Sequence, residues 1–205
     1  MGTAYHTSDA PFGFQPWDCV LRARYYAVQT NPTIHICIGD MVRHGGTAVS
    51  TPYGYKPIVD DDAVIATSEE DILGAVLACF DENMYPINHI NVARTGNSTI
   101  AGYILVADHP DQLFIGQEDG DSNAIDLDEV GLYADLAPTA LNEPDSNTYL
   151  STMQIDSTSA TNGAAHLALI EPHEDDTPGN DTYPYARWIV KIYQHYYASA
   201  NADGA

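Results

Sequence analysis

The acidic segment that begins at Asp119 contains the residue types that could bind a cation. It starts like an EF-hand loop, because Asp119, Asp121 and Asn123 place oxygen ligands at the first, third and fifth positions. Ala124 then stands where the loop needs glycine, and Val130 stands where a bidentate glutamate belongs. The EF-hand match therefore fails, and a solvated acidic loop is the default interpretation. An irregular cation site built from these acids stays open.

Histidine and cysteine, the usual ligands of transition metals, are scattered along the chain. The 8 histidines form no HExxH motif, and the run that starts at His173 lies between two prolines, which is typical of a charged loop. The 3 cysteines, Cys19, Cys37 and Cys79, are odd in number and form no CxxC pair. This pattern favours buried free thiols over a disulfide scaffold or a zinc site.

Motifs for nucleophilic catalysis and phosphate binding are missing from the sequence. No serine sits in a GxSxG elbow, and Gly45-Gly46 lacks the Lys-Ser/Thr pair of a phosphate-binding loop. Pairs of carboxylates occur in any chain with 29 acids, so they do not by themselves indicate a glycosidase. We therefore predict no catalytic residue, no cofactor and no metal ligand, and a protein that is not an enzyme.

The charge of the chain narrows the range of partners. Its 205 residues include 29 Asp and Glu against 7 Lys and Arg, a formal net charge of −22. So few cations cannot form a large basic face, which excludes nucleic acid and polybasic membrane binding. Because 44% of the residues are hydrophobic, the chain is expected to fold with an acidic surface. We expect no targeting segment, and no stretch approaches the ~20 apolar residues of a membrane span.

The segments that would position any site are short and rich in β-forming residues. Their hydrophobicity alternates, so that Trp188, Val190 and Ile192, for example, fall on one face. Breakers such as Asn31-Pro32 separate them. This pattern predicts a mainly β fold, an antiparallel β-sandwich or barrel with long acidic loops and one or two short helices. The candidate strands are 19–28, 33–38, 87–93, 102–107, 112–117, 149–155, 166–170 and 186–197.

In three segments the sequence indicates a helix or a turn, alone or as an alternative to a strand. Ser68 and Asp71 form a helix-start signal before the apolar run 72–80, and that run fits a buried strand equally well. The segment 126–136 could hold a helical turn, and the glycines of 44–47 predict a turn.

The chain is expected to form one domain between two terminal segments. Residues 1–18 are predicted to be an extended N-terminal arm, residues 19–197 a single β-rich domain, and residues 198–205 a flexible C-terminal tail. The acids cluster, whereas the basic residues lie elsewhere. If the basic residues converge in the fold, the molecule has a less acidic side that could dock on a partner. The acidic clusters are 60–82, 108–135 and 171–181.

Several segments, taken in order, resemble the head decoration (cement) proteins of tailed bacteriophages. The first has a Pro-Phe-Gly-Phe-x-Pro sequence, the second Ile-x-x-Gly-Asp-x-Val, the third Ile-Leu-Gly, the fourth Val-Ala-Asp-x-Pro and the last Trp-x-Val-Lys-Ile. Two acidic segments, 60–71 and 171–181, depart from the family pattern. The similar segments are 11–17, 36–42, 72–76, 104–114 and 186–196.

This resemblance implies a β-rich protein on the outer surface of the virion head, assembled in the host cytoplasm and without catalytic residues. It would bind the major capsid protein after expansion and stabilise the shell, with many modest contacts adding up over the particle. It also implies a homo-oligomer, with a homotrimer at local three-fold positions as the first choice and a homodimer as the second.

Two sets of residues are candidates for contacts with the capsid or with another subunit. The apolar N-terminal set is expected to lie across the capsid or a neighbouring subunit, and packing on the chain's own core is the alternative. The basic set could meet acidic capsid patches, and ordinary surface charges explain it equally well. The apolar set is Phe12, Phe14 and Trp17, and the basic set is Arg22, Arg24, Arg43 and Lys191.

Three other interpretations share the composition of this chain. Another virion component, such as a minor head or tail-fibre protein, would differ in its place on the particle. An acidic carbohydrate-binding β-sandwich could stack exposed tyrosines and Trp188 on sugars. A halophilic enzyme would show a similar excess of acids over lysines.

Overall fold

The fold is described from a computed structural model, and the prediction of a mainly β fold with short helices is confirmed. The described residues are 9–30, 32, 35–59, 71–91, 100–121, 124–137, 150–157, 165–174 and 185–199. The strands are β1 (Gln15–Pro16), β2 (Ala23–Gln29), β3 (Ile36–Cys37), β4 (Met41–Thr51), β5 (Gly54–Val59), β6 (Ile72–Phe80), β7 (Pro86–Ile87), β8 (His89–Ile90), β9 (Ile100–Ala107), β10 (Leu113–Gln117), β11 (Tyr133–Ala134), β12 (Leu167–Pro172) and β13 (Arg187–Ile192). The helices are η1 (Leu127–Glu129) and α1 (Tyr196–Ser199).

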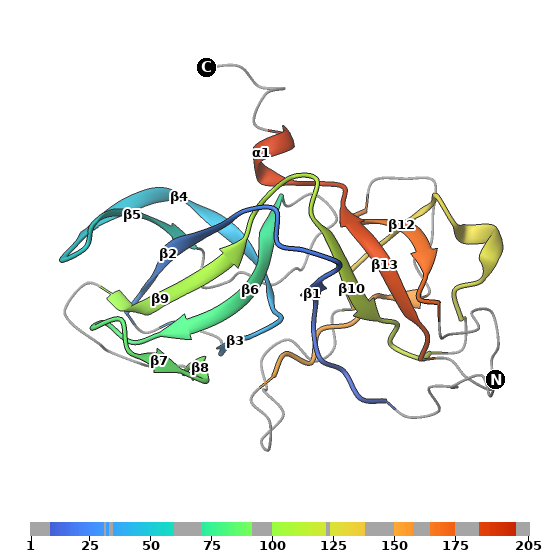
Figure 1. Ribbon diagram of the computed structural model, residues 1–205, viewed down its shortest axis with the longest axis horizontal. Helices are drawn as coiled ribbons and strands as arrows, with labels where there is room; N and C mark the ends of the chain where they lie inside the picture. Colours follow the sequence, from blue (N-terminus) through green and yellow to red (C-terminus); the bar gives the residue numbers. More distant parts are fainter. Residues whose placement is uncertain are drawn as a thin grey trace.

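Five strands close into a barrel in the order β4-β5-β2-β9-β6, because β4 also pairs with β6 (Figure 1). Strand β4 can do this because its first residues pair with β6 and its last residues with β5. The register on β5 shifts between His44 and Ala48, which marks a bulge in β4. The predicted turn at 44–47 is therefore wrong, since the glycines there bend a continuous strand.

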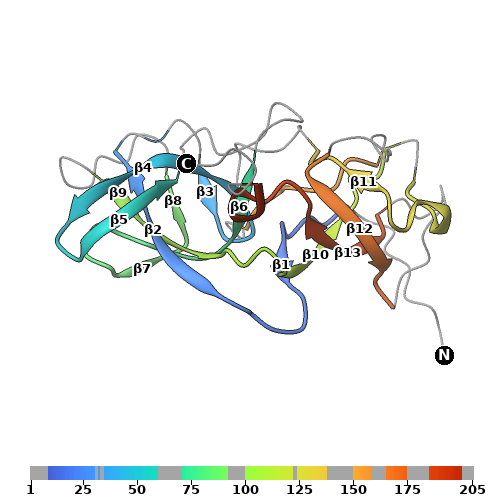
Figure 2. The same ribbon diagram turned by 90° about the horizontal axis from the view of Figure 1, so that it is seen from above.

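A second, antiparallel sheet has the order β1-β10-β13-β12-β11 and lies beside the barrel (Figure 2). Trp188, Val190 and Ile192 are all buried, as the predicted alternation requires, but Ile189, which falls on the opposite face, is buried as well. The predicted strand 186–197 is wrong beyond Ile192. There the His195 Nδ1 accepts a hydrogen bond from the Tyr197 amide, a local contact that favours a turn, and α1 begins.

One hydrophobic core joins the barrel to the second sheet. Met41, Ile72 and Ala107 of the barrel belong to the same buried cluster as Phe114 and Trp188 of the sheet. A separate cluster fills the barrel interior. Its buried members are Tyr26, Val28, Ile36, Val42, Val59, Leu73, Val76, Cys79, Ile90, Ala101, Ile104 and Val106.

The structure gives the secondary structure of the segments for which the sequence left alternatives open, as far as these segments are described. The run 72–80 is strand β6, and it is apolar throughout because it lies in both buried clusters. The predicted helical turn within 126–136 is η1, with a capping box between Asp126 and Glu129. Of the predicted strand 149–155, the described residues 150–155 make only isolated bridges, at Leu150 and Ile155.

Some expectations fall on residues outside the described part of the chain. These include Ser68, the first part of the proposed arm (1–8), most of the tail (200–205) and most of the acidic segment 171–181. Within the described part, no helix has both the length and the apolar character needed to cross a membrane.

Candidate functional site

Asp108, at the end of β9, is the centre of a polar cluster between the barrel and the second sheet. Its side chain is 0% exposed. Arg22 Nε donates to one carboxylate oxygen at 2.8 Å, and Arg24 Nε and the Tyr26 hydroxyl donate to the other, each at 2.5 Å. Burial alone would raise the pKa of Asp108, but these three hydrogen bonds outweigh it and lower the pKa. The buried carboxylate is therefore charged and fully paired.

Tyr197 of α1 covers this cluster. The Arg24 guanidinium lies 4.5 Å from the centre of its ring and that of Arg22 lies 5.4 Å away, both in cation–π contact. The Tyr197 and Tyr26 hydroxyl oxygens are 3.0 Å apart. The cluster thus ties three distant parts of the chain together: β2, the end of β9, and α1.

The residues before α1 are joined to β6. The Ile72 amide donates to the Gln194 carbonyl at 2.8 Å. The neighbouring His195 is buried, and burial lowers its pKa to about 4, so it is neutral at pH 7. Because His195 is neutral and burial raises the pKa of Tyr26, neither group is poised for proton transfer near pH 7. The arrangement serves to hold segments together.

The structure brings only part of the predicted basic set together. Arg22 and Arg24 meet at Asp108, as internal partners of the fold. Lys191, in strand β13 of the second sheet, has its Nζ 2.6 Å from a carboxylate oxygen of Asp111. Arg43 is half-buried in β4. The ion pairs of Arg22 and Arg24 therefore have a structural role that the sequence did not predict.

The predicted apolar set belongs, where described, to the body of the protein. Phe14 is fully buried, and its amide donates to the Gly39 carbonyl at 2.8 Å. Phe12 and Trp17 are half-buried, and the Trp17 ring lies 5.1 Å from that of His173. Phe14 as a capsid contact is thus wrong for this fold, because a side chain inside the core cannot touch a partner.

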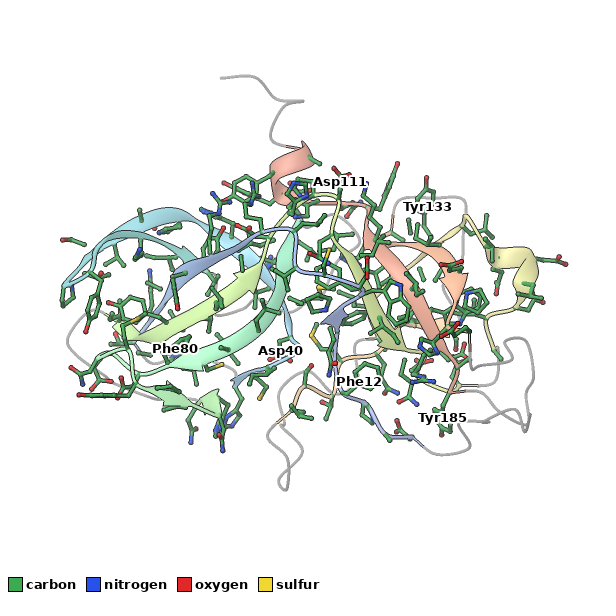
Figure 3. All side chains as sticks on the ribbon, in the orientation of Figure 1. Phe12, Asp40, Phe80, Asp111, Tyr133 and Tyr185 are labelled. Carbon is green, nitrogen blue, oxygen red and sulfur yellow. The ribbon has the colours of Figure 1, made fainter. Side chains whose placement is uncertain are left out.

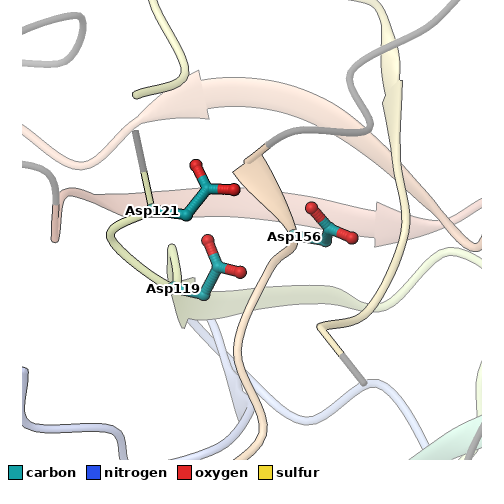
Figure 4. Close-up of side chains that lie close together, drawn as sticks. All are labelled: Asp119, Asp121 and Asp156. Atoms are coloured by element: carbon teal, nitrogen blue, oxygen red, sulfur yellow. The ribbon is translucent and has the colours of Figure 1, made fainter. Parts of the chain in front are cut away.

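Three aspartates approach one another beyond β10 (Figure 4). One carboxylate oxygen from each of Asp119, Asp121 and Asp156 lies within 4.8 Å of the others. The Ser157 hydroxyl is 2.9 Å from Asp119 and 2.7 Å from Asp121, and its single proton can serve one of them at a time. Oxygen ligands of this kind suit a hard cation. Half-exposed acids also gather without one, so we assign no metal here.

Glu118 lies directly before this group and is fully buried. Its two carboxylate oxygens accept hydrogen bonds from the Ile125 amide at 2.9 Å and from the Ala186 amide at 3.0 Å. Burial raises its pKa to about 8, even though these amides favour the charged form. Glu118 therefore holds two loop ends against the second sheet.

No family model, curated protein or solved structure matches this chain. Its function must therefore be argued from its own contacts and surfaces. Nothing in the sequence indicated the roles of Asp156, Glu118 and Tyr197, because each has at least one partner that is remote in sequence. Asp108 was indicated only through the resemblance, as the Asp of Val-Ala-Asp-x-Pro.

Of the three cysteines, only Cys19 has a thiol that solvent can reach. Cys37 and Cys79 are buried, and burial raises the pKa of both thiols, so they are poor nucleophiles. Cys19 is exposed, which corrects the expectation that all the cysteines are buried.

The exposed apolar side chains form the surfaces that a partner could use. On the barrel, Tyr53 lies 5.7 Å from Tyr103 and its hydroxyl donates to Asn83, in the turn that also presents Tyr85. Trp188 is fully buried, so the prediction that it stacks on sugars is wrong. The other described residues that are apolar and exposed lie before and in β2, at η1, and in or directly after strands of the second sheet; they are Val20, Leu21, Tyr25, Leu127, Val130, Ile170 and Tyr193.

We expect Glu118 to make stability fall with rising pH. Its pKa is about 8 in the folded protein and near its ordinary value of 4.5 when unfolded, so between these values only the unfolded chain releases the proton. The free energy of unfolding should drop by about 2 kcal/mol between about pH 5.5 and pH 7. Urea unfolding of wild type and Glu118→Gln at several pH values measures this.

The glutamine variant supplies the control, because it cannot titrate. Its lower stability in acid is expected, since glutamine has one acceptor oxygen for two amides. The comparison is between the slopes of the free energy of unfolding against pH. Equal slopes for the wild type and Glu118→Gln would contradict the raised pKa of Glu118.

Proposed function

We propose that this protein is a structural component of the virion, on the outer surface of a phage head. It binds the major capsid protein and stabilises the expanded shell. The observation that carries this proposal is where the segments similar to decoration proteins lie: they meet one another inside the fold.

Glycines of these segments make close backbone contacts from one segment to another. A Cβ on Gly13, in the first segment, would lie 2.5 Å from the Gly39 carbonyl oxygen of the second. A Cβ on Gly74, in the third, would lie 1.9 Å from the Ala107 oxygen of the fourth. The fourth and last segments pair as β10 and β13. The resemblance thus falls on residues that determine packing, which supports a shared fold and a role in assembly.

The chemistry of the described residues favours binding over catalysis. Asp108 is paired with arginines, and Glu118 and Asp40 accept backbone amides, so each of these buried acids holds the chain in place. A protein repeated over a shell needs only modest affinity at each contact, because multivalency strengthens the whole. A homotrimer remains our first choice of oligomer.

A carbohydrate-binding module is the second candidate. The observation in its favour is the group of exposed tyrosines Tyr25, Tyr53 and Tyr85, because aromatic faces can stack on sugar rings. Glycan-array binding that is lost in Tyr53→Ser and Tyr85→Ser would support it over the capsid proposal.

The proposed function is tested by mass in solution. We expect light scattering to give a discrete trimer or dimer, and expanded heads of the encoding phage, prepared without this chain, to bind it in fixed, saturable proportion. A monomer that does not bind those heads would overturn the proposal.

A further inference from the structure

We propose that the edge of the second sheet around β11 and β12 is the surface that docks on the capsid protein. This inference rests on the proposed function. The docking surface consists of Leu127, Val130, Tyr133, Ile170 and Tyr193. Its partner on the shell is inferred to carry apolar side chains flanked by Lys or Arg.

Backbone pairing places these side chains together. Tyr133 is paired with Ala168, and the ladder continues because the Gly131 amide donates to the Leu169 carbonyl at 2.8 Å. Antiparallel pairing thus carries Val130 past the end of β11 to the neighbourhood of Ile170. Leu127 lies beside Val130, because the Val130 amide donates to the Leu127 carbonyl in η1 and side chains three residues apart in such a turn lie on one side.

A bulge turns Ile170 outward. On β13, Leu169 pairs with Val190 and Glu171 with Ile189, which leaves Ile170 without a partner there. Its side chain is 38% exposed, and it shares the outer face of the strand with Ala168. An unpaired apolar residue at the rim of a sheet is well placed to meet another protein.

Aromatic rings and a small hollow extend this surface. The rings of Tyr133 and Tyr193 lie 4.2 Å apart, and Tyr133 is at the outer side of the sheet in Figure 3. Beside them a hollow of about 220 Å³ is lined by Ala168, Lys191 and Tyr193, among others. Tyrosines beside apolar side chains are typical of the centre of a protein interface.

Charge decides which partner fits. Asp128 and Glu171 are exposed beside the docking surface, and within the described part of the chain no cation pairs with either. Lys191 is bound to Asp111, so it does not neutralise them. A second copy of this surface would bring like charges together, whereas a basic, apolar surface would complement both the charge and the apolar area.

Binding of purified variants to expanded heads that lack this protein tests the inference. Leu127→Ser/Ile170→Ser should weaken binding at least about tenfold, because truncated central residues dominate interface energies. Asp128→Asn/Glu171→Gln should slow association and reduce its dependence on salt. The matched control is Tyr85→Ser on the barrel, since Tyr85 is 68% exposed and Leu127 63%. It should bind like wild type.

The outcomes separate the two proposals. If wild type binds the heads and Leu127→Ser/Ile170→Ser binds equally well, this docking surface is wrong and the proposed function stands. If that variant instead loses its oligomeric state in light scattering, the surface binds a second copy, which also overturns the inference. If wild type fails to bind, the proposed function falls, and this inference with it.

Discussion

Replacing Asp108 by asparagine is expected to lower the free energy of unfolding by about 3 kcal/mol, because two arginines lose the buried charge that pairs them. Their guanidinium groups stay close together, held over Tyr197, with nothing to balance them. Urea unfolding followed by tryptophan fluorescence measures the change, since Trp188 is fully buried in the adjoining core.

Asp111→Asn is the matched control for this prediction. Asp111 lies three positions further along the chain, and its ion pair with Lys191 is at the surface, with 68% of its side chain exposed. Solvent screens such a pair, so little change is expected. The double variant Asp108→Asn/Arg24→Gln should lose less free energy of unfolding than the sum of the losses in the two single variants, because it also removes one of the unpaired positive charges. Equal stabilities of Asp108→Asn and Asp111→Asn would contradict this account.

Gly74→Ala is expected to destabilise the barrel by about 3 kcal/mol or to prevent folding, because β6 and β9 leave no room for a methyl group. The added Cβ would lie 1.9 Å from the Ala107 backbone oxygen, which can move only if the strand moves. Thermal and urea unfolding, with soluble yield as the measure for a variant that does not fold, test this prediction.

Gly46→Ala is the control that distinguishes the effect of a steric clash from the effect of an unfavourable backbone conformation. Gly46 has a φ of +70° but nothing within 4 Å of the added Cβ, so only the conformational cost of about 1 kcal/mol applies. If Gly74→Ala were no less stable than Gly46→Ala, the close contact between β6 and β9 would not limit the choice of residue.

Much of the fold could be predicted from local pattern. Trp188, Val190 and Ile192 are buried at every second position, and the segment 126–136 contains the helical turn η1, because both features depend on near neighbours. The run 72–80 could not be assigned, since a strand buried against two clusters has no polar face to show its period.

The candidate sites could be predicted much less well. Asp108 and Arg22 are 86 residues apart in sequence, and Asp156 joins Asp119 from a different part of the chain. No spacing rule connects residues so remote. For the same reason, the exposure of Ile170 depends on a bulge between β12 and β13 that its own sequence does not reveal.

The sequence alone determined the class and character of this protein: a mainly β fold, a net charge of −22 and short strands separated by turns. Only the tertiary structure decided that Phe14 and Trp188 are buried and that Arg22 and Arg24 pair internally. The physical reason is that composition and alternation act locally, whereas burial and charge pairing arise when distant segments pack. The apolar surface left for a partner is what remains after that packing.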